Sequence, residues 1–474
     1  MNTPARALRQ RLVEADGRPV LFDLYERSRS GSELVENVDR LSGAVLEASR
    51  EKPRVGLWYR NSLSAVEAFL AVEWIGGTRV PVDPGASAEE ARAVFEAAAV
   101  DIVLTDASHG AAFSGNALIH DDQHRLAGYP REPVNFFDPG QTLVLYPRAV
   151  VGGRLFGIPL SYRNWNAIVE TNVALYRSKR YGAWDESSEV FLTAQQLMHG
   201  SGFLGTFPFL AMGLPQVIVD QFNITKVVDA IERHRVTSLM TVPAMLQALI
   251  GAAEQEPRRV ASLRHILYGG APMPEEQLVR GIQLFSGALT QVYGRVEGGW
   301  PISTLGTAAH TAIGEGTSKL LGSCGQPIAE VQTRLRPIPV EPEDVGELLV
   351  KSEMTSAEYA DADGWCSLGD VMRRDEAGNL FYLRRLDRMI NTGYHVYPEE
   401  IEAMIAAEPG IASVRVVGEA HPDWGQMVVA YVVPTTNVST ESLPSSLKAA
   451  LERRLAKYKI PREFRIVHEI PSAA

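Results

Sequence analysis

Residues 383–402 read LRRLDRMINTGYHVYPEEIE, and this stretch decides how the chain is divided. It combines charged residues, a turn around Gly393 and the start of a helix at Pro398. Charged, turn-rich joints of this kind are typical of hinges between domains and unlike core elements. The stretch therefore predicts a joint at Asp387 between a long region before it and a short region after it.

The two regions on either side of this joint differ in pattern. Helix and strand signals alternate through most of residues 1–386, which predicts parallel sheets covered by helices. In SAVEAFLAVEW at 64–74, Ser64 followed by Glu67 predicts a capping box at a helix start. Residues 387–474 read as helix, two strands, helix and strand, which predicts a small lobe. We expect an α/β fold: a large layered α/β domain with parallel sheets at 1–386, and a small C-terminal α+β lobe at 387–474.

Composition excludes several classes of protein. The 474 residues are too many for one core, and 46 basic against 57 acidic residues give a formal charge of −11. This balance argues against a dedicated nucleic-acid binder or a binder of anionic membranes. Cys324 and Cys366 supply neither a disulfide framework nor metal-ligand spacing. The first residues show no apolar core of a signal peptide, so a cytoplasmic location is expected.

One long apolar run resembles a membrane span. Residues 190–219, VFLTAQQLMHGSGFLGTFPFLAMGLPQVIV, contain no Asp, Glu, Lys or Arg, and their length would allow a transmembrane helix. Pro208, Pro215 and the polar pair Gln195 and Gln196 argue against a regular membrane helix. We therefore expect no membrane span, and interpret the run as backbone buried in the protein that lines an apolar cavity.

Several motifs occur together in a fixed order along the chain. They are NSLSAVEAFLAVEWIGGTRVPVDP at 61–84, the His199 segment, VTSLMTVPAML at 236–246, YGGAPMP at 268–274, YGRVE at 293–297, GELLV at 346–350, DGWCSLGD at 363–370, the 383–402 stretch and HPDWGQMVVAYVV at 421–433. In this order they resemble the AMP-forming adenylating enzymes: acyl- and aryl-CoA synthetases, adenylation domains of peptide synthetases and luciferases. The resemblance runs from about residue 34 to residue 471. It implies activation of a carboxylic acid by ATP to an acyl-adenylate, followed by transfer to a nucleophile.

The resemblance also implies a nucleotide site. Asp370 matches the carboxylate that accepts hydrogen bonds from both ribose hydroxyls, and Arg385 matches a second ribose contact. Tyr293 and Gly294 match the adenine-binding part of Tyr-Gly-x-Thr-Glu, and Glu297 matches the residue that helps to hold Mg²⁺. Without the resemblance, the same residues would be a Gly-Asp turn, a hinge ion pair, aromatic packing and a solvated glutamate.

A pocket for the acid is implied beside the nucleotide site. Gly269, Gly270 and Ala271 match the loop next to the acyl-adenylate, where small residues let the backbone approach the ligand. His199 matches a histidine at the mouth of the acyl pocket, although a lone histidine in an apolar run is often only a hydrogen-bonded core residue. Phe203 and Trp300 are candidate substrate contacts, and a medium-sized apolar or aromatic acid would fit them. Candidate catalytic residues are His199, Glu297 and Arg385.

Two parts of the family pattern are altered. The phosphate loop, Tyr-Thr-Ser-Gly-Thr-Thr-Gly-x-Pro-Lys-Gly in the family, is replaced by YPRAVVGGRLFG at 146–157, and Val296 stands at the threonine position of Tyr-Gly-x-Thr-Glu. Arg148 or Arg154 could supply charge, but guanidinium groups do not reproduce a cradle of hydroxyls. The lysine expected after Pro471 has no counterpart in the sequence. We therefore expect weakened use of ATP.

Three functions remain open at this point. The first is an AMP-dependent acid ligase that uses ATP, with AMP as product, and Mg²⁺, and that passes the acyl group to CoA, to the phosphopantetheine thiol of a carrier protein, or to an amine. The second is an acyl transferase that takes a preformed adenylate or thioester. The third is a non-catalytic protein that binds an adenylate-like ligand or a partner. The sequence names neither the acid nor the acceptor.

Overall fold

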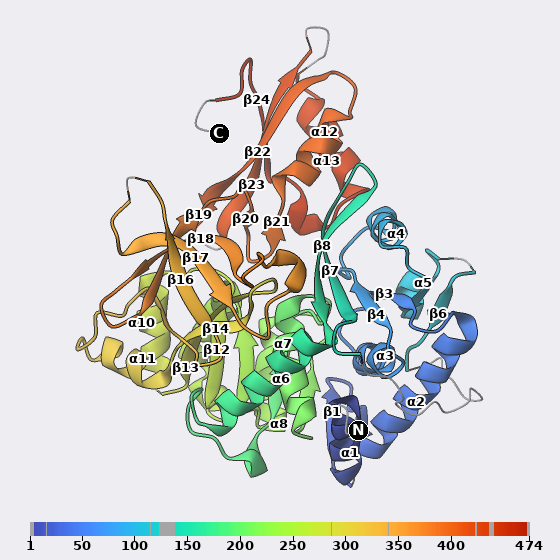
Figure 1. Cartoon of the computed structure of the whole chain (residues 1–474), viewed down its shortest axis with the longest axis vertical. Coiled ribbons are helices and arrows are strands. Elements are labelled where there is room, and N and C mark those ends of the chain that lie inside the picture. Colours follow the sequence, from blue (N-terminus) through green and yellow to red (C-terminus); the bar gives the residue numbers. More distant parts are fainter. Residues whose placement is uncertain are drawn as a thin grey trace.

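The chain is divided into a large body and a small C-terminal lobe, which lies at the top of Figure 1. The computed structural model describes residues 4–15, 17–113, 115–122, 138–285, 287–339, 341–421, 424–435 and 440–471, without the side chains of Pro4, Phe203 and Leu204. The α/β fold with a small α+β lobe, as expected from the sequence, is confirmed.

A large mixed sheet forms the centre of the body. Its parallel part contains β1 (Pro19–Asp23), β10 (Gln216–Ile218), β9 (Phe191–Thr193), β11 (Ser238–Thr241), β12 (His265–Gly269) and β13 (Leu289–Arg295). Antiparallel strands extend it: β2 (Ser28–Ser30) on one side, and β14 (Gly299–Leu305), β15 (Ser323–Pro327), β19 (Leu380–Arg385), β18 (Cys366–Arg374), β17 (Val345–Lys351) and β16 (Gln332–Pro337) on the other.

A second sheet lies beside the first. Its strands are, in spatial order, β6 (Ala117–Ile119), β5 (Ile102–Thr105), β3 (Arg54–Trp58), β4 (Thr78–Pro81), β7 (Thr142–Val151) and β8 (Arg154–Ser161). All neighbouring pairs are parallel except β7 and β8. The parallel pairs agree with the helix–strand alternation of the sequence, because parallel strands need crossover helices.

Helices cover both sheets, and one core lies between them. Helix α3 (Leu63–Trp74) is buried on every side, as expected for an apolar helix between two layers. The other helices of the body are α1 (Pro4–Glu14), α2 (Gly31–Ala48), α4 (Ala88–Ala97), α5 (Ala107–Gly110), α6 (Tyr162–Arg177), α7 (Gly200–Ala211), α8 (Ile224–His234), α9 (Pro243–Gln255), α10 (Glu275–Leu284) and α11 (Thr307–Gly314). A second core lies between the large sheet and α8, α9 and α10.

The C-terminal lobe has its own hydrophobic core. Helices α12 (Pro398–Ala406) and α13 (Leu443–Glu452) pack on a sheet of β22 (Ile411–His421), β23 (Gly425–Pro434) and β24 (Glu463–Ile466). The short pair β20 (Ile390–Asn391) and β21 (His395–Val396) follows the 383–388 joint, and Ile390 belongs to this core. The division at Asp387 stays a prediction that these contacts support.

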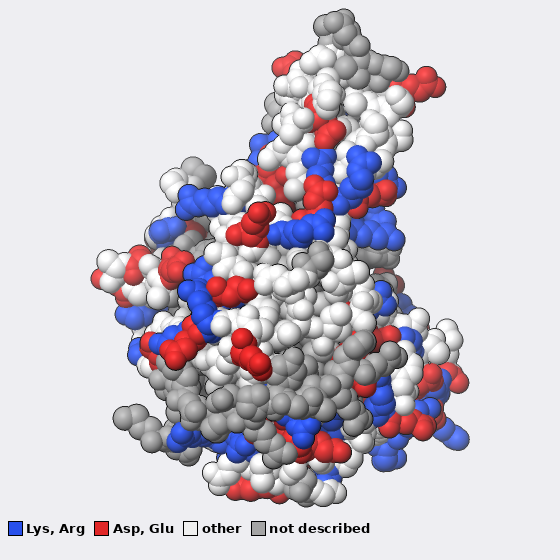
Figure 2. Space-filling view, turned by 90° about the vertical axis from the view of Figure 1, so that its right-hand side faces the viewer, with Lys and Arg blue, Asp and Glu red and all other residues white. Residues whose placement is uncertain are grey.

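Charge is mixed over the surface. Figure 2 shows Lys and Arg side chains interspersed with Asp and Glu on the face that carries α4 and the C-terminal lobe. No helix in the described part of the chain is both long enough and apolar enough to cross a membrane. The apolar run 190–219 is instead divided among β9, α7 and β10.

One local expectation, the capping box at Ser64, was wrong. Helix α3 is capped by Ser62, whose side chain accepts a hydrogen bond from the backbone N–H of Ala65, so Ser64 lies inside the helix. Glu67 makes no capping box and is instead buried between Arg29 and His120. Helix α13 ends at Glu452, and residues 457–459 form a separate short 3₁₀ turn.

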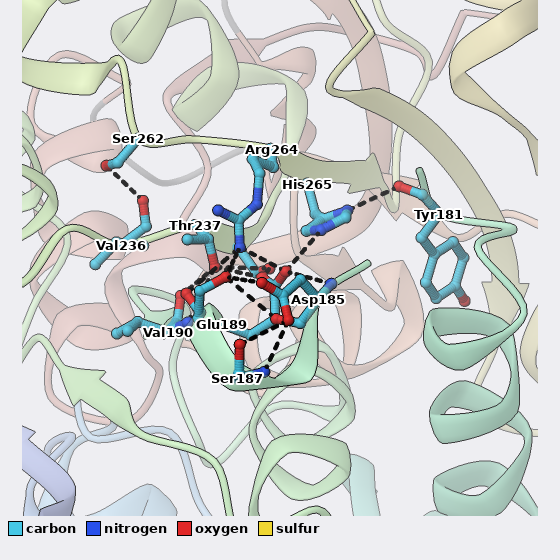
Figure 3. Close-up of polar contacts among 12 residues, drawn as sticks. Tyr181, Asp185, Ser187, Glu189, Val190, Val236, Thr237, Ser262, Arg264 and His265 are labelled. Atoms are coloured by element: carbon cyan, nitrogen blue, oxygen red, sulfur yellow. Dashed lines mark hydrogen bonds and ion pairs between the residues drawn. The ribbon is translucent and has the colours of Figure 1, made fainter. Parts of the chain in front are cut away.

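A buried polar cluster fixes the amino ends of the parallel strands. Figure 3 shows Glu189 between Thr237, Arg264 and His265. Glu189 lies two residues before the first residue of β9, and Thr237 and Arg264 directly precede β11 and β12. The cluster therefore ties three strands together at the edge of the sheet opposite their carboxyl ends.

Candidate functional site

A cavity of about 410 Å³ lies at the carboxyl ends of the parallel strands, where the C-terminal lobe meets the body. Ligands bind at this edge in open α/β sheets. The body contributes the segments after β4, β9, β11, β12 and β13, and the lobe contributes residues 392–395, Tyr458 and Lys459. Five of the predicted site residues line this cavity: His199, Gly269, Gly270, Gly294 and Trp300.

His199 is paired with a carboxylate at the cavity wall. Its Nε2 lies 2.5 Å from Oδ2 of Asp83, the residue that follows β4 in the VPVDP motif. Burial alone would raise the pKa of Asp83, but its hydrogen bond and electrostatic attraction to His199, the backbone N–H of Gly85 and the charge of Lys459 together lower it. The ring of His199 also lies 4.9 Å from that of Tyr394 in the hinge stretch. His199 is therefore held in place from both parts of the molecule.

The glycine loop separates the cavity from a neighbouring hollow. Gly269 and Gly270 line the main cavity, whereas Ala271 and Pro272 line a second hollow with Arg385. Gly270 has φ +85°, and a Cβ on Gly269 would lie 2.1 Å from the carbonyl oxygen of Val292, so small residues are required here. The Asn391 side chain donates to the carbonyl oxygen of Gly270 at 2.9 Å, so the hinge stretch contacts this loop directly.

A chain of hydrogen bonds joins the three predicted nucleotide residues. The Tyr293 hydroxyl donates to Oδ2 of Asp370 at 2.5 Å, and Nη1 of Arg385 donates to Oδ1 at 2.5 Å. Arg385 is bonded on its other side to Asp387. Asp370 is only 2% exposed, and burial raises its pKa more than Arg295 and Arg385 lower it. Each carboxylate oxygen keeps a lone pair, so the group fits a pair of hydroxyl donors.

Glu297 lies between two guanidinium groups. Oε1 accepts a hydrogen bond from Arg148 Nη2 at 2.7 Å and from Arg295 Nε at 2.9 Å. Burial would raise the pKa of Glu297, but Arg295 and Arg148 lower it to about 2. Because two guanidinium groups already contact the carboxylate of Glu297, this carboxylate is a poor ligand for a metal cation. Among the described residues, no group of three or more His, Cys, Asp or Glu side chains is placed to hold a metal ion. Mg²⁺ at Glu297 does not fit this arrangement.

The segment at the position of the phosphate loop is a β-hairpin, with a shift of register between Pro147 and Ala149. Strands β7 and β8 pair from Thr142 with Ser161 to Val151 with Arg154, and Gly152 and Gly153 form the turn with φ of 57° and 75°. Two positive φ values in a two-residue turn are the geometry that hairpins favour. Strand pairing uses backbone groups that a phosphate cradle would need free. Figure 1 shows the hairpin rising beside α12, where the N–H of Val150 donates to Glu400 at 3.3 Å.

The two candidate arginines of this hairpin differ in position. Arg148 lines the main cavity and lies over the rings of Tyr359 and Tyr397, at 5.2 and 5.3 Å from their centres. Arg154 lies at the end of the hairpin and contacts Phe156, which is exposed. Of the two, only Arg148 lies where a ligand in the cavity would meet it.

The remaining predicted residues fall around the cavity in different ways. Tyr293, Glu297, Asp370 and Arg385 do not line it, and Arg385 and Ala271 line the second hollow. The Phe203 side chain lies outside the described residues, although its backbone belongs to α7.

Sequence reasoning missed four residues of this region: Asp83, Arg295, Tyr458 and Lys459. Asp83 could have been found, because it follows a strand at the carboxyl edge of a parallel sheet. Arg295 stands inside the quoted YGRVE motif but was not singled out. Tyr458 and Lys459 have no local signal, because their partners Tyr394, His199, Glu400 and Glu90 lie far from them in the sequence.

Comparison with known proteins agrees with the motif order. The model of the AMP-binding enzyme family matches residues 8–134 and 153–360, and that of the AMP-binding enzyme C-terminal domain matches residues 400–474. The first match is interrupted at 135–152, the segment that contains Arg148.

Similar proteins include ligases from bacteria and plants. A 2-succinylbenzoate–CoA ligase of Bacillus velezensis is 32% identical over 360 residues, which cover 72% of this chain and 68% of that protein. A 4-coumarate–CoA ligase of Oryza sativa subsp. japonica is 27% identical and covers 98% of this chain, with 88% of its own length matched. The structure of the amide bond synthetase McbA from Marinactinospora thermotolerans superposes with a TM-score of 0.84 at 25% identity, covering 98% of this chain and 96% of that one. This chain belongs to the AMP-binding enzyme family, that is, to the AMP-forming adenylating enzymes.

Proposed function

We propose that this protein is an acid-activating ligase that joins a small carboxylic acid to AMP and then passes the acyl group to a nucleophile. The proposal rests on the position of the end of β13, which connects the predicted nucleotide residues with the cavity. Tyr293 bonds Asp370, and the next residues, Gly294 to Val296, line the cavity. Since successive Cα atoms are about 3.8 Å apart, a nucleotide held at Asp370 would lie next to an acid held in the cavity.

Within this proposal each group has a separate task. Asp370 and Arg385 hold the ribose, with Tyr293 orienting the carboxylate of Asp370. The acid occupies the cavity beside Gly269, Gly270 and Trp300, and His199 lies at its wall. Arg148, which has donors left after bonding Glu297, is the candidate to meet the phosphate or the acyl carboxylate. The geometry of Glu297 supports no role for it as a Mg²⁺ ligand.

The proposal names the acceptor of the acyl group only by its chemical class. Relatives of this chain carry the names of CoA ligases and of an amide bond synthetase. A thiol such as CoA or an amine is therefore the acceptor class that we propose, with carrier phosphopantetheine as a further thiol. These names favour a ligase over a transferase that needs a preformed adenylate and over a non-catalytic binding protein.

The test is acid-dependent exchange of pyrophosphate into ATP by the full chain, measured over a panel of aliphatic and aromatic acids. The proposal predicts exchange above background for at least one acid, and release of AMP when CoA or an amine is added. Calorimetry with AMP is run in parallel as a check of the nucleotide site. AMP binding without exchange for any acid would contradict the ligase proposal, and absence of both would contradict the nucleotide site as well.

A further inference from the structure

Two buried glutamines have side-chain amides without hydrogen-bond partners. Within the part of the chain that the structure describes, both amide atoms of Gln195 and both of Gln216 are buried without a partner, and the two side chains are 5% and 0% exposed. An unpaired amide in a protein interior lowers stability, so such a group calls for an explanation. The two residues differ in one respect: Gln195 lines the main cavity, and Gln216 does not.

The backbone at Gln195 is fixed, so the amide has no easy route to water. The Asn61 side chain donates to the carbonyl oxygens of Gln195 at 2.8 Å and of Val219 at 3.0 Å, and it accepts from the N–H of Leu197 at 2.8 Å. Asn61 is itself buried, with 3% exposed. This clamp holds the 195–197 segment against two other parts of the body and preorganises the Gln195 side chain at the cavity wall.

The cavity that Gln195 lines carries both apolar side chains and charged ones such as Arg148, Arg295 and Lys459. Met198, Met240, Val242, Met245 and Trp300 line the same cavity, and His199 is already paired with Asp83. The neighbouring Gln196 also lines it, and its Oε1 likewise has no partner. A pocket that combines apolar side chains with a few polar groups is the usual form of a site that orients a small molecule.

We infer that Gln195 selects the substrate, and that the acid carries an uncharged hydroxyl or carboxamide on an otherwise apolar body. Such groups donate and accept hydrogen bonds at once, and so can satisfy both atoms of the amide. A purely apolar acid would leave the amide unpaired in the complex as well. Sites built to bond a polar group reject the analogue that lacks it. This inference rests on the proposed function, since it assumes that the cavity holds the acid.

The experiment compares isosteric acids that differ only in a hydroxyl against a methyl group. Suitable probes are para-hydroxyphenylpropionate with para-methylphenylpropionate, and a series of hydroxy fatty acids with their methyl-branched counterparts. Binding of each to the full chain is measured by calorimetry at saturating AMP. We expect at least one hydroxy acid to bind about tenfold more tightly than its methyl isostere.

Two matched variants separate recognition from stability. In Gln195→Leu the preference should be lost or reversed, because the amide that would bond the hydroxyl group is gone. Gln216→Leu removes an equally unpaired amide at the amino end of β10, and Gln216 does not line the cavity. It should leave the acid preference unchanged. Neither variant should lower the melting temperature, since each removes an unsatisfied group, and AMP affinity should stay within twofold in both.

Equal binding of both members of every pair, or binding of none, would overturn the inference, as would an unchanged preference in Gln195→Leu. Failure of the proposed function looks different. Discrimination between isosteres without pyrophosphate exchange would contradict the ligase proposal and support the role of Gln195. Pyrophosphate exchange with equal use of both isosteres would support the ligase proposal and contradict the role of Gln195.

Discussion

The charge around Glu297 determines which residue can meet a phosphate in this protein. Glu297 is held by Arg148 and Arg295, so the three side chains together carry one net positive charge. In the family pattern a glutamate at this position helps to hold Mg²⁺ and a lysine contacts the phosphates. Here a guanidinium group from the altered segment lies at the glutamate instead. At the scale of single residues, the positive charge beside Glu297 comes from Arg148 and Arg295.

Arg148→Ala should therefore impair adenylation selectively. Loss of one preorganised charged contact typically lowers the rate by about 10²–10³-fold. We expect a fall of that order in acid-dependent pyrophosphate exchange, whereas Arg154→Ala at the end of the hairpin should stay within twofold. Circular dichroism and melting temperature serve as folding controls, because Glu297 keeps Arg295 in the variant. A larger loss in Arg154→Ala than in Arg148→Ala would mean that Arg154, and not Arg148, contacts the phosphate.

Asp370→Ala should weaken AMP binding. Hydrogen bonds to a charged acceptor contribute about 1.5–3 kcal/mol, so the dissociation constant measured by calorimetry should rise at least tenfold. Asp375→Ala is the matched control, because Asp375 lies in the turn after the same strand and its side chain bonds Asn379 and the backbone of that turn. Unchanged AMP affinity in Asp370→Ala would remove Asp370 from the nucleotide site.

The residues found from sequence and those missed differ in a physical way. Tyr293, Asp370 and Arg385 stand in contiguous motifs, and the structure brings them into one hydrogen-bonded chain. The partner of His199 is Asp83, and that of Glu297 is Arg148, each pair more than a hundred residues apart. Such pairings arise from the packing of the two sheets, which no local spacing encodes. The sequence therefore indicated His199, Glu297 and Arg148 only as separate residues, and it did not indicate Asp83.

Among the elements, the β7–β8 hairpin departs most from expectation. The resemblance aligns residues 146–157 with a phosphate loop, whereas the structure forms two paired strands there. A pair of glycines such as Gly152 and Gly153 between two apolar runs is a hairpin signal. The parallel strands, in contrast, were predictable because their helix–strand alternation is a local pattern.

The Glu189 cluster makes a prediction at the same scale. Burial would raise the pKa of Glu189, but His265, Thr237 and Arg264 lower it to about 2. Glu189→Gln at pH 7 should lower the free energy of unfolding by about 3 kcal/mol, because a buried charged partner of Arg264 is lost. Urea unfolding measures this, and Asp185→Asn in the exposed part of the same loop should stay within about 0.5 kcal/mol.

The pH dependence of this effect has a defined sign. A carboxyl group whose pKa is lower in the folded state stabilises the protein fully above its unfolded pKa of about 4.5, and that stabilisation is lost as pH falls towards about 2. The difference between the wild-type protein and Glu189→Gln should therefore shrink between these pH values. Pyrophosphate exchange at pH 7 should be unaffected, since the cluster lies at the opposite edge of the sheet. A difference that grows with acidification would contradict this account.

At the scale of the whole molecule, the joint at 383–402 is one of several contacts between body and lobe. Asn391 bonds Gly270, Tyr394 contacts His199, and the rings of Tyr394 and Tyr458 lie 4.7 Å apart. The sequence predicted the joint and the separate lobe, but not that residues near the end of the chain complete the cavity wall. If Asp387 is the hinge, movement of the lobe opens the cavity, because its far wall moves with residues 392–395, Tyr458 and Lys459.

Lys459 provides the test of this arrangement. Its Nζ lies 2.6 Å from Glu90 on α4 and 3.0 Å from Glu400 on α12, and all three side chains are buried. Burial would lower the pKa of Lys459, but Glu400, Tyr458 and Glu90 raise it well above its ordinary value, so the ammonium group stays charged. Removing one partner of a buried ionic group typically costs about 3–5 kcal/mol. Lys459→Met should therefore weaken the contact between the lobe and the body.

Hydrogen exchange read by mass spectrometry would measure this weakening. In Lys459→Met we expect at least tenfold faster exchange in β7, β8 and α12, with unchanged exchange in the parallel strands of the body. Lys457→Met is the matched control, since Lys457 belongs to the same short turn but is exposed, and it should leave the pattern unaltered. Faster exchange spread evenly over the whole chain would mean general destabilisation. Unchanged exchange in the hairpin would mean that Lys459 does not hold the lobe, and that the cavity stays closed by the joint alone.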